Sequence, residues 1–404
     1  MITREYKFYN TLIIKALGNI SKLNKCRKDF ICEVFILFLC IKGRVNFLQL
    51  GRFGSFGEQR YRQQFEKPFD FLSFNKELIL ANGSGRYIIA FDPSYISKSG
   101  KGTAGLDWYW SGCAGKSKWG LEIGGIAAID IDNHTAFHLE AIQTLCDENE
   151  TLTQWYIGIL EKRKATLTSI SCIFVADAWF SKKNFVDAVI QMRMQFVSRL
   201  RDDADLRYLC GDAPTGKKGR PKKYDGKIAT RNIDSGYFEL IEQTDEYTMN
   251  SAIVYSKSLK RNIRLVHVAY NTKNGKQAIK LYYSTDVDLS PKDILLYYQS
   301  RFQIEFLYRD GKQHTSLCDV QARGENKLNF HFNASLTAIN IAKINDWLSI
   351  PKEERKSFSL SDIKTMNHNK LLMFRFFDVF GIDPNKPKNK RYVKELLYYG
   401  TMAA

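Results

Sequence analysis

The sequence lacks the pairings that would make its cysteines a metal site or a disulfide framework. Eight cysteines occur in 404 residues, none of them forms a CxxC pair, and several lie inside apolar runs. The six histidines show no metal-ligand spacing with these cysteines. We therefore expect reduced cysteines in the core and no zinc site.

A run of apolar residues long enough to cross a bilayer is also missing. The most apolar stretch, FICEVFILFLCI, has about a dozen residues and contains a glutamate, whereas a transmembrane helix needs about 20. The N-terminus, MITREYKFYN, does not have the charged and then apolar pattern of a signal peptide. These absences predict no membrane partner and a location in the cytoplasm of a prokaryote, in association with the nucleoid.

Acidic residues are in short supply. Lys and Arg number 60 against 43 Asp and Glu, which gives a formal net charge of +17. Nucleic acid is the natural partner of so basic a protein, although ribosomal and membrane-surface proteins can show the same charge. With 44% hydrophobic residues the chain can bury a sizeable core, so we expect a folded protein.

The hydrophobic periodicity predicts a mixed α/β fold. The first 84 residues suit short helices, either a helix-turn-helix domain or a bundle packed on the core. Three strands, a helix and a buried parallel strand then follow, which is the element order of an RNase H-like core. We expect five segments: a helical N-terminal DNA-binding domain (1–84), the first part of an RNase H-like core (85–201), a β-strand insertion (202–290), the second part of the core with two helices (291–346), and a basic C-terminal region (347–404) that is loosely ordered from residue 384. The two helices are PKDILLYYQSRFQIEFLYRDGK and NFHFNASLTAINIAKINDWL.

Two aspartates stand at the ends of predicted strands. Asp92 follows YIIAF and Asp177 follows CIFVA. An ionised carboxylate beside a buried strand is costly unless it is paired or binds a cation. In the expected element order the two strands are neighbours, so the aspartates would meet and Mg²⁺ would neutralise them. For either aspartate taken alone, the favoured interpretation is that it merely ends a strand or caps a turn.

Four polar residues of the helix expected after the insertion share one face. Tyr298, Arg301, Glu305 and Lys312 have the spacing Y-x2-R-x3-E-x6-K. Offsets of 3, 7 and 14 residues bring them to one side of a helix with about 3.6 residues per turn. This face offers one acid between two cations and a phenol.

The sequence here resembles the transposases of insertion-sequence family four, the DDE group named for its Tyr-Arg-Glu-Lys signature. The resemblance covers about residues 85 to 345, with the runs Asp92-Pro93-Ser94 and Asp177-Ala178-Trp179-Phe180 at the two aspartates. It implies an RNase H-like fold with a β-strand insertion before the catalytic Glu305. Proline after Asp92 departs from the commoner family pattern.

The resemblance implies cut-and-paste transposition by two-metal phosphoryl transfer. Asp92, Asp177 and Glu305 would hold two Mg²⁺ ions, for which Mn²⁺ could substitute. Tyr298, Arg301 and Lys312 would grip phosphates of double-stranded DNA. The expected partners are the terminal inverted repeats and target DNA, bound by a homodimer that pairs two transposon ends.

Two other functions stay open on the sequence. One is a catalytically inactive or repurposed transposase-derived DNA-binding protein, and the other is a different RNase H-like nuclease. If the strand register differs from our assignment, another acid could replace a member of the triad. These rival acids are Glu122, Asp130, Asp132 and Asp310.

Within the insertion, the run KKGRPKKYDGK is strongly basic. Its cations include Lys217, Lys218, Arg220, Lys222 and Lys223. The GRP core resembles the AT hook, whose arginine suits a narrow minor groove, so the run is a candidate DNA contact. The alternative is a solvated basic loop.

Two further features are weaker candidates. Members of the resembled family can flip a DNA base onto an aromatic side chain, and Trp179 or a tyrosine of the insertion could supply that surface. The run SKSGKGTAG, residues 97–105, could cradle a phosphate. Because GxxxxGK[ST] is absent, a hairpin turn is our preferred interpretation of the run.

Overall fold

The computed structural model describes residues 6–20, 23–210, 222–271 and 277–402. The chain forms two compact units. Unit 1 comprises Met1–Gly85, Pro93–Cys146 and Gln303–Ala404, and unit 2 comprises Arg86–Asp92 and Asp147–Phe302. Strand β1 (Tyr87–Ser97) runs through the boundary between them.

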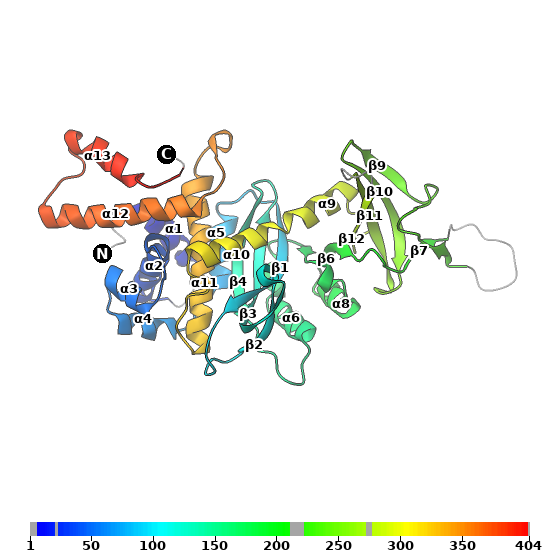
Figure 1. The fold of residues 1–404 in the computed structure, drawn as a ribbon, viewed down its shortest axis with the longest axis horizontal. Helices are drawn as coiled ribbons and strands as arrows, with labels where there is room; N and C mark the ends of the chain where they lie inside the picture. Colours follow the sequence, from blue (N-terminus) through cyan, green and yellow to red (C-terminus); the bar gives the residue numbers. More distant parts are fainter. Residues whose placement is uncertain (1–5, 21–22, 211–221, 272–276, 403–404) are drawn as a thin grey trace. The chain divides into compact units, whose positions relative to one another are not determined.

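Unit 1 is mostly helical (Figure 1). Its α-helices are α1 (Lys7–Gly18), α2 (Lys25–Cys40), α3 (Phe47–Phe53), α4 (Glu58–Phe65), α5 (Phe71–Leu80), α10 (Gln303–His314), α11 (Glu325–Ala342), α12 (Leu360–Phe380) and α13 (Pro387–Leu397). Helix α2 packs against α11 and α12, so the N-terminal helices join the helices that follow the signature region. A π-helical turn, Lys343–Leu348, continues α11.

The most apolar stretch of the sequence forms the buried helix α2. Asn24 caps the start of this helix by accepting a hydrogen bond from the Arg27 backbone N–H. The glutamate inside the stretch, Glu33, is buried, and its carboxylate accepts hydrogen bonds from the Ser55 backbone N–H and the Tyr61 hydroxyl. Buried polar groups need such partners. None of the helices formed by the described residues is both long and apolar enough to cross a membrane.

The strands of unit 1 form a meander. These are β2 (Asp107–Ser111), β3 (Lys116–Asp130) and β4 (Thr135–Gln143), beside the second half of β1. The start of β3 pairs with β2, and its remainder pairs with β4. Because β3 is longer than either partner, it holds the exposed β2 and the buried β4 in one sheet.

Asparagine side chains form hydrogen bonds with the backbone N–H and carbonyl groups on the outer edge of β4. Asn340 of α11 accepts from the His138 backbone N–H (2.8 Å) and donates to the His138 carbonyl (2.7 Å). Two helical turns earlier, Asn333 does the same for the N–H and carbonyl of Ala141, both at 2.8 Å. These amides replace the partners that a further strand would supply. They fix α11 against the sheet.

Unit 2 is built around a mixed sheet. The first half of β1 pairs in parallel with β5 (Ile173–Val175), and β5 pairs in parallel with β6 (Gln195–Leu200). The sheet continues in antiparallel order through β12, β11, β10, β7 and β8, and β9 pairs with β10. These later strands are β7 (Leu206–Leu209), β8 (Tyr224–Lys227), β9 (Glu239–Gln243), β10 (Tyr247–Ser256), β11 (Arg261–Asn271) and β12 (Gln277–Ser284).

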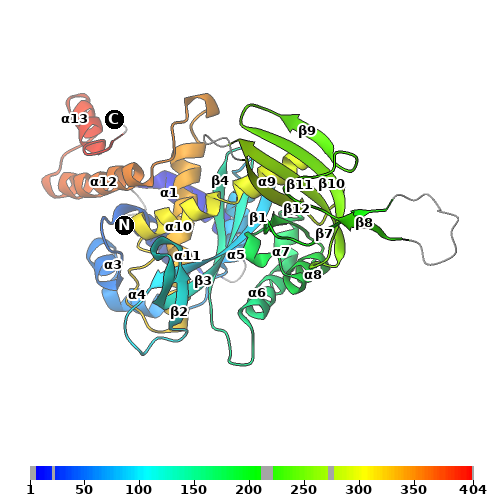
Figure 2. The same cartoon turned by 45° about the vertical axis from the view of Figure 1, so that its right-hand side comes forward.

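Helices cover both faces of this sheet. They are α6 (Leu152–Glu161), α7 (Lys164–Thr168), α8 (Lys183–Gln191) and α9 (Pro291–Ser300). Figure 2 shows β10, β11 and β12 side by side, with α9 over them and α8 on the side of β6 away from α9. Phe196 of β6 contacts Phe185 of α8, whereas Tyr282 of β12 contacts Tyr298 of α9.

The fold is mixed α/β, as the periodicity predicts, but several local predictions are wrong. Periodicity does not predict strand β2. The run 97–105 connects β1 to β2. These two strands are not neighbours in the sheet, because each of them pairs with β3, so the run is not a hairpin turn.

The prediction that the cysteines lie in the core is also wrong in part. All eight cysteines are free, but four of them are exposed: Cys26, Cys113, Cys146 and Cys172.

The helix after the insertion is interrupted. Helix α9 ends at Ser300 and α10 begins at Gln303. The Arg301 N–H donates to the carbonyls of both Tyr297 and Tyr298, and the Phe302 N–H donates to the Gln299 carbonyl. The i to i−3 bonds among these tighten the turn, and sequence periodicity does not reveal such a local change.

The segment from residue 384 forms α13, against the expectation of loose order. Pro387 stands in its first turn, where its fixed φ favours a helix. The Asn369 side chain of α12 donates to the carbonyls of Leu397 and Tyr399, 3.0 and 2.8 Å away. These two bonds tie the end of α13 to α12.

Candidate active site

Asp92 and Asp177 lie at the same level on neighbouring parallel strands. Asp177 follows the end of β5, whereas Asp92 lies inside β1, which continues to Ser97, so the predicted strand-end position of Asp92 is wrong. The register pairs Ile89 with Phe174 and Ala90 with Val175. Continued by two residues, the same offset sets Asp92 opposite Asp177. The end of the parallel β1–β5 pairing thus brings the two acids together, which is a common position for a functional site in a mixed sheet. The pairing with β5 ends before Pro93, so its missing N–H costs no hydrogen bond on that side.

The chain after Asp177 folds back in a short 3₁₀ turn, Ala178–Phe180. The Asp177 carboxylate caps this turn by accepting from the Trp179 backbone N–H at 2.8 Å. Phe180 enters the core, where its ring contacts Phe91. Trp179 remains 44% exposed. The D-A-W-F run therefore fixes one acid and presents one aromatic side chain beside it.

A cation that the sequence patterns do not single out accompanies this tryptophan. The Lys182 ammonium lies 3.3 Å from the centre of the Trp179 ring. Its pKa is lowered by burial, against the opposing effect of Asp177. The spacing W-x2-K could have indicated the contact, but such short pairs are common on protein surfaces.

Arg301 connects the aspartates to two aromatic residues in unit 2. Its Nη1 lies 4.0 Å from Oδ1 of Asp92, and its guanidinium lies 5.7 Å from the ring centre of Tyr298. Tyr298 in turn packs on Tyr282 with ring centroids 5.1 Å apart. Burial raises the pKa of the Tyr298 phenol, which therefore stays protonated at neutral pH. Two of the four signature residues thus lie near the aspartates.

The other two signature residues, Glu305 and Lys312, belong to α10 in unit 1. Glu305 is partly buried in the first turn of α10, where the helix dipole favours a carboxylate. The Lys312 ammonium donates to the Ser94 hydroxyl, 2.9 Å away. Since Ser94 follows Asp92 by two residues in β1, this bond ties α10 to the strand that carries the first aspartate.

A glycine sets the approach of α10 to the sheet of unit 1. A Cβ atom at Gly125 of β3 would lie only 1.8 Å from the Tyr308 hydroxyl. Tyr308 is about one turn of α10 beyond Glu305. The absence of a side chain at Gly125 therefore allows the helix its close position.

Three of the rival acids have structural partners in unit 1. Asp130 is fully buried and accepts from the N–H groups of Ser84 and Asn133 and from the Ser84 hydroxyl. Glu122 accepts from the Thr144 hydroxyl. Asp310 forms an ion pair with its neighbour Arg309. These contacts give each of the three acids a structural role.

Comparison with known families matches residues 84–341 to the family described as the transposase DDE domain. The match covers more than half of the chain and includes every strand and acid of the candidate site. The chain belongs to the DDE transposase family. No functionally curated protein matches it. Membership implies a transposase, an enzyme that acts on DNA.

DDE transposases generally use divalent metal ions, and the donor chemistry here suits such an ion. Two carboxylates held level on adjacent strands repel each other, and hard carboxylate oxygens are the ligands that Mg²⁺ prefers. Among the described residues, no group of three or more His, Cys, Asp and Glu side chains is arranged to hold a metal ion. The pair Asp92 and Asp177 is the best-defined part of the candidate site.

The basic run of the insertion is described only in part. Lys217, Lys218 and Arg220 lie outside the described residues. Lys222 and Lys223 are exposed, and Lys222 forms an ion pair with Asp225 at 3.2 Å. An exposed pair of this kind contributes little to stability, so both lysines can contact a DNA backbone.

Proposed function

We propose that this transposase carries out cut-and-paste transposition of an insertion sequence of family four through phosphodiester hydrolysis and strand transfer. The observation that carries the proposal is the β1–β5 register, which sets Asp92 level with Asp177. Asp92, Asp177 and Glu305 are the proposed ligands of two Mg²⁺ ions, with Mn²⁺ as a substitute. The catalytic core is RNase H-like, and the β-strand segment 202–290 is its insertion.

Two divalent cations supply Lewis-acid activation of the attacking and leaving oxygens. The protein's own residues position the DNA. Arg301, oriented by its contact with Tyr298, offers a planar guanidinium that suits bidentate contact with phosphate. Lys312, held by Ser94, adds a second phosphate contact. Trp179 presents an aromatic surface next to Asp177 for an unstacked base.

A decisive experiment measures cleavage and strand transfer on DNA that carries the element's own inverted repeats. We expect Asp92→Asn, Asp177→Asn and Glu305→Gln each to lower both rates by well over the roughly 10–100-fold that loss of an outer-sphere partner costs. The exposed Asp378→Asn and Glu239→Gln are matched controls and should keep parental rates.

Asp310→Asn tests the rival acid on α10. If Asp310→Asn is inactive while Glu305→Gln retains parental rates, the third ligand is Asp310 and the triad is wrong. If the carboxylate variants still bind the repeats as tightly as the parent while only cleavage is lost, DNA binding and catalysis are separable. A parent that binds but never cleaves would instead support a repurposed DNA-binding protein.

Cut-and-paste transposition pairs two transposon ends, and we propose a homodimer for this step. Mass measurement of the protein with inverted-repeat DNA should give complexes of two chains and two ends. A stable, active complex of one chain with one end would refute the dimer.

A further inference from the structure

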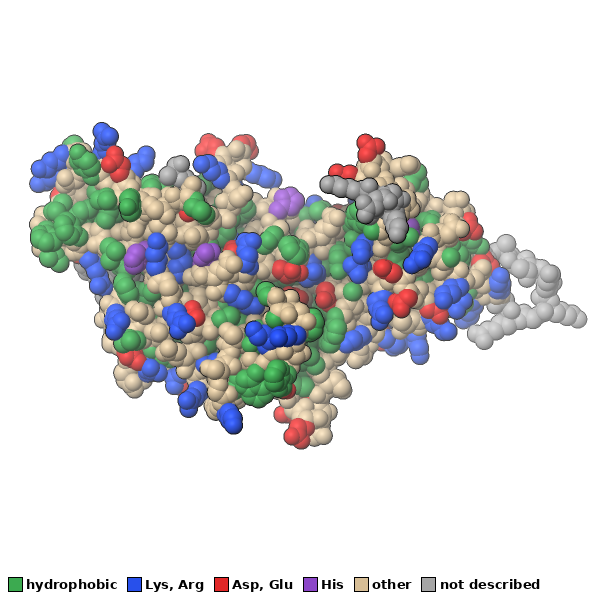
Figure 3. All heavy atoms as spheres, viewed as in Figure 1, with side chains coloured by type: hydrophobic (Ala, Val, Ile, Leu, Met, Phe, Trp, Pro, Cys, Tyr) green, Lys and Arg blue, Asp and Glu red, His purple; other side chains and the backbone are tan. Residues whose placement is uncertain are grey.

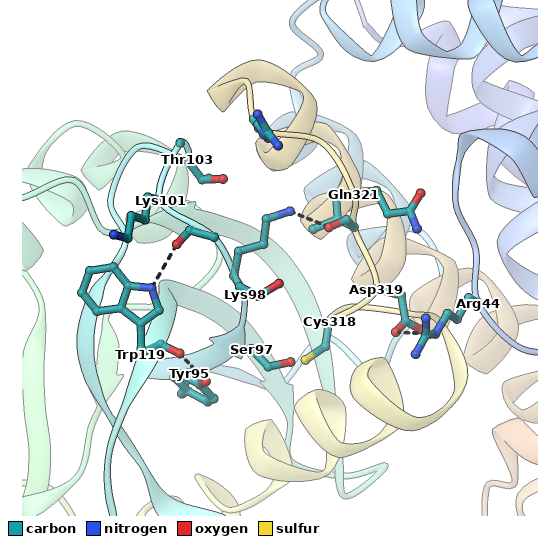
Figure 4. A pocket seen from close by; sticks show the side chains of 15 residues that line it. Arg44, Tyr95, Ser97, Lys98, Lys101, Thr103, Trp119, Cys318, Asp319 and Gln321 are labelled. Carbon is teal, nitrogen blue, oxygen red and sulfur yellow. Dashed lines mark hydrogen bonds and ion pairs between the residues drawn. The ribbon is translucent and has the colours of Figure 1, made fainter.

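A cavity of about 950 Å³ lies in unit 1, and none of the acids of the candidate site lines it. Four segments line it: the connection after β1 with Lys98 and Lys101, the strand residue Trp119, the stretch from Cys318 to Arg323, and Arg44. Figure 4 shows these side chains around the opening, with Arg44 beside Asp319. The cavity includes the run SKSGKG, for which the proposed catalytic function has no role.

Hydrogen bonds hold the walls of the cavity in place. The Lys98 ammonium donates to the carbonyls of Val320 and Ala322 at 2.7 and 2.8 Å, which joins the first wall to the third. The Trp119 indole N–H donates to the Gly100 carbonyl at 3.3 Å. Gly100 has a φ of +97°, a conformation that favours glycine. The cavity is thus a defined site that does not need a ligand to form it.

The lining is basic. Lys98, Lys101, Arg44 and Arg323 face one acid, Asp319, which lies 3.7 Å from Arg44. Lys101 and Arg323 are exposed, and the hydroxyls of Ser97, Ser99 and Thr103 complete the polar lining. Cations with hydroxyl groups and a glycine-rich connection suit the oxygens of phosphate groups.

Tryptophans extend the cavity wall onto the surface. Trp119 of β3 is 40% exposed, and the β2–β3 ladder brings Trp108 directly opposite. Trp110 lies on the same face as Trp108, two residues along, and these two are 64% and 66% exposed. Figure 3 shows hydrophobic side chains gathered over β2, with Lys and Arg side chains nearby. We call Trp108, Trp110 and Trp119 the tryptophan surface.

We propose that the cavity and the tryptophan surface together bind unpaired nucleotides of a DNA strand. Phosphates enter the basic cavity, and bases stack on the tryptophan rings. Stacking on exposed aromatic side chains beside a basic groove is how proteins hold single strands, because the faces of bases within a duplex are already covered. The inference rests on the proposed function in taking DNA as the substrate, but it does not depend on the carboxylate triad.

The test measures the anisotropy of a labelled oligothymidylate of about 12 nucleotides, within the usual site sizes, added to the full-length protein. We expect Trp108→Ala/Trp119→Ala to weaken binding at least about tenfold, since stacking contributes roughly 1–3 kcal/mol per base. Lys101→Ala/Arg323→Ala should weaken it similarly and flatten its salt dependence. Trp108→Phe keeps a stacking ring and should restore part of the affinity.

Matched controls remove the same chemistry elsewhere in unit 1. Phe380→Ala/Tyr399→Ala removes two exposed aromatic residues, and Lys388→Ala/Lys390→Ala removes two exposed cations. Neither control should change oligothymidylate binding. A second measurement, photocross-linking with iododeoxyuridine, should attach the strand to Trp108, Trp110 or Trp119. Unchanged affinity in both test variants, or cross-links confined to Trp179, would overturn the inference.

Running the assay with Asp177→Asn as well as the parent separates this inference from the proposed function. Binding needs no cleavage, so the tryptophan and cation effects should be the same in both backgrounds. If the carboxylate variants cleave normally but the tryptophan variants lose the oligonucleotide, only the proposed function is wrong. The reverse pattern overturns only the single-strand site.

Discussion

Arg301 is the side chain that most directly links the signature to the acid Asp92. Its position depends on two contacts, one with the Asp92 carboxylate and one with the Tyr298 ring. Lysine keeps the positive charge but has no planar group to stack on the ring or to bind phosphate at two points.

We therefore predict that Arg301→Lys lowers the single-turnover cleavage rate about 10–100-fold, the usual cost of losing an orienting partner, with little change in DNA affinity. Arg309→Lys is the matched control, because Arg309 also lies over an aromatic ring, that of Phe306 at 4.7 Å. Parental cleavage by Arg301→Lys would show that the guanidinium geometry is not used.

His138 is buried in β4, and its Nε2 lies 3.0 Å from the Asn333 side-chain oxygen. Burial lowers its pKa from 6.5 to about 3. Below pH 6.5 the His138 imidazole is protonated in the unfolded chain but stays neutral in the folded chain. The free energy of unfolding therefore falls as pH drops from 6.5 towards 3.

His138→Gln keeps an amide donor for Asn333 but cannot titrate. We expect urea unfolding at about pH 7 and about pH 4.5, on either side of the ordinary histidine pKa, to show a smaller acid loss of stability for this variant than for the parent. His331, whose pKa burial lowers to about 4, should supply part of the loss that remains. An identical pH dependence in parent and variant would rule out His138 as a source of acid sensitivity.

At the scale of elements, the contact of α10 with β3 decides where Glu305 and Lys312 stand in unit 1. We predict that Gly125→Ala lowers the free energy of unfolding by about 1–3 kcal/mol, the usual cost of overpacking, and also slows cleavage. The added Cβ would meet the Tyr308 hydroxyl at 1.8 Å and its ring carbon Cζ at 2.8 Å. Tyr308→Phe removes only the nearer of these two atoms, so it should recover part of the stability and not all of it.

Gly158→Ala is the control for this substitution. Gly158 lies in α6, and no atom lies within 4 Å of the place that an alanine methyl group would take. Alanine there should therefore be neutral or stabilising by about 0.5–1 kcal/mol. Equal stability of Gly125→Ala and the parent would show that α10 can shift without cost.

The elements that the sequence predicts well are those with a strong buried pattern. Strands β1, β3 and β4 carry long apolar runs that periodicity identifies. Strand β2 cannot be found in this way, because DWYWS exposes most of its residues on a sheet edge. The interruption between α9 and α10 depends on a change in backbone hydrogen-bond partners, which side-chain periodicity does not reveal.

The candidate site likewise has features that sequence predicts and features that it does not. The strand-end position of Asp177 could be predicted, whereas Asp92 lies inside β1. The level alignment of the two acids needs the β1–β5 register, which sequence does not contain. The bond between Lys312 and Ser94 joins residues 218 positions apart, and no local pattern indicates it. The sequence does not predict the tryptophan surface, because its three rings lie on two strands and one of these, β2, has no recognisable hydrophobic pattern.

At the scale of the whole molecule, the excess of positive charge is the property most directly tied to DNA. A net charge of +17 attracts a duplex through its phosphates whatever its sequence. At Asp92 and Asp177 the carboxylates would repel the phosphates of bound DNA, and divalent cations would relieve that repulsion.

Because binding of this kind releases counterions from DNA, its strength must depend steeply on salt. We predict that affinity for inverted-repeat duplex falls about 10³-fold or more between roughly 50 and 200 mM salt, as for proteins that make about 6–10 phosphate contacts. Binding of the short single strand at the tryptophan surface should fall less, since stacking does not release ions. Titrations of both DNAs across this salt range measure the two slopes. A flat duplex slope would mean that the positive charge does not face DNA, and equal slopes would mean that the single strand is held by charge alone.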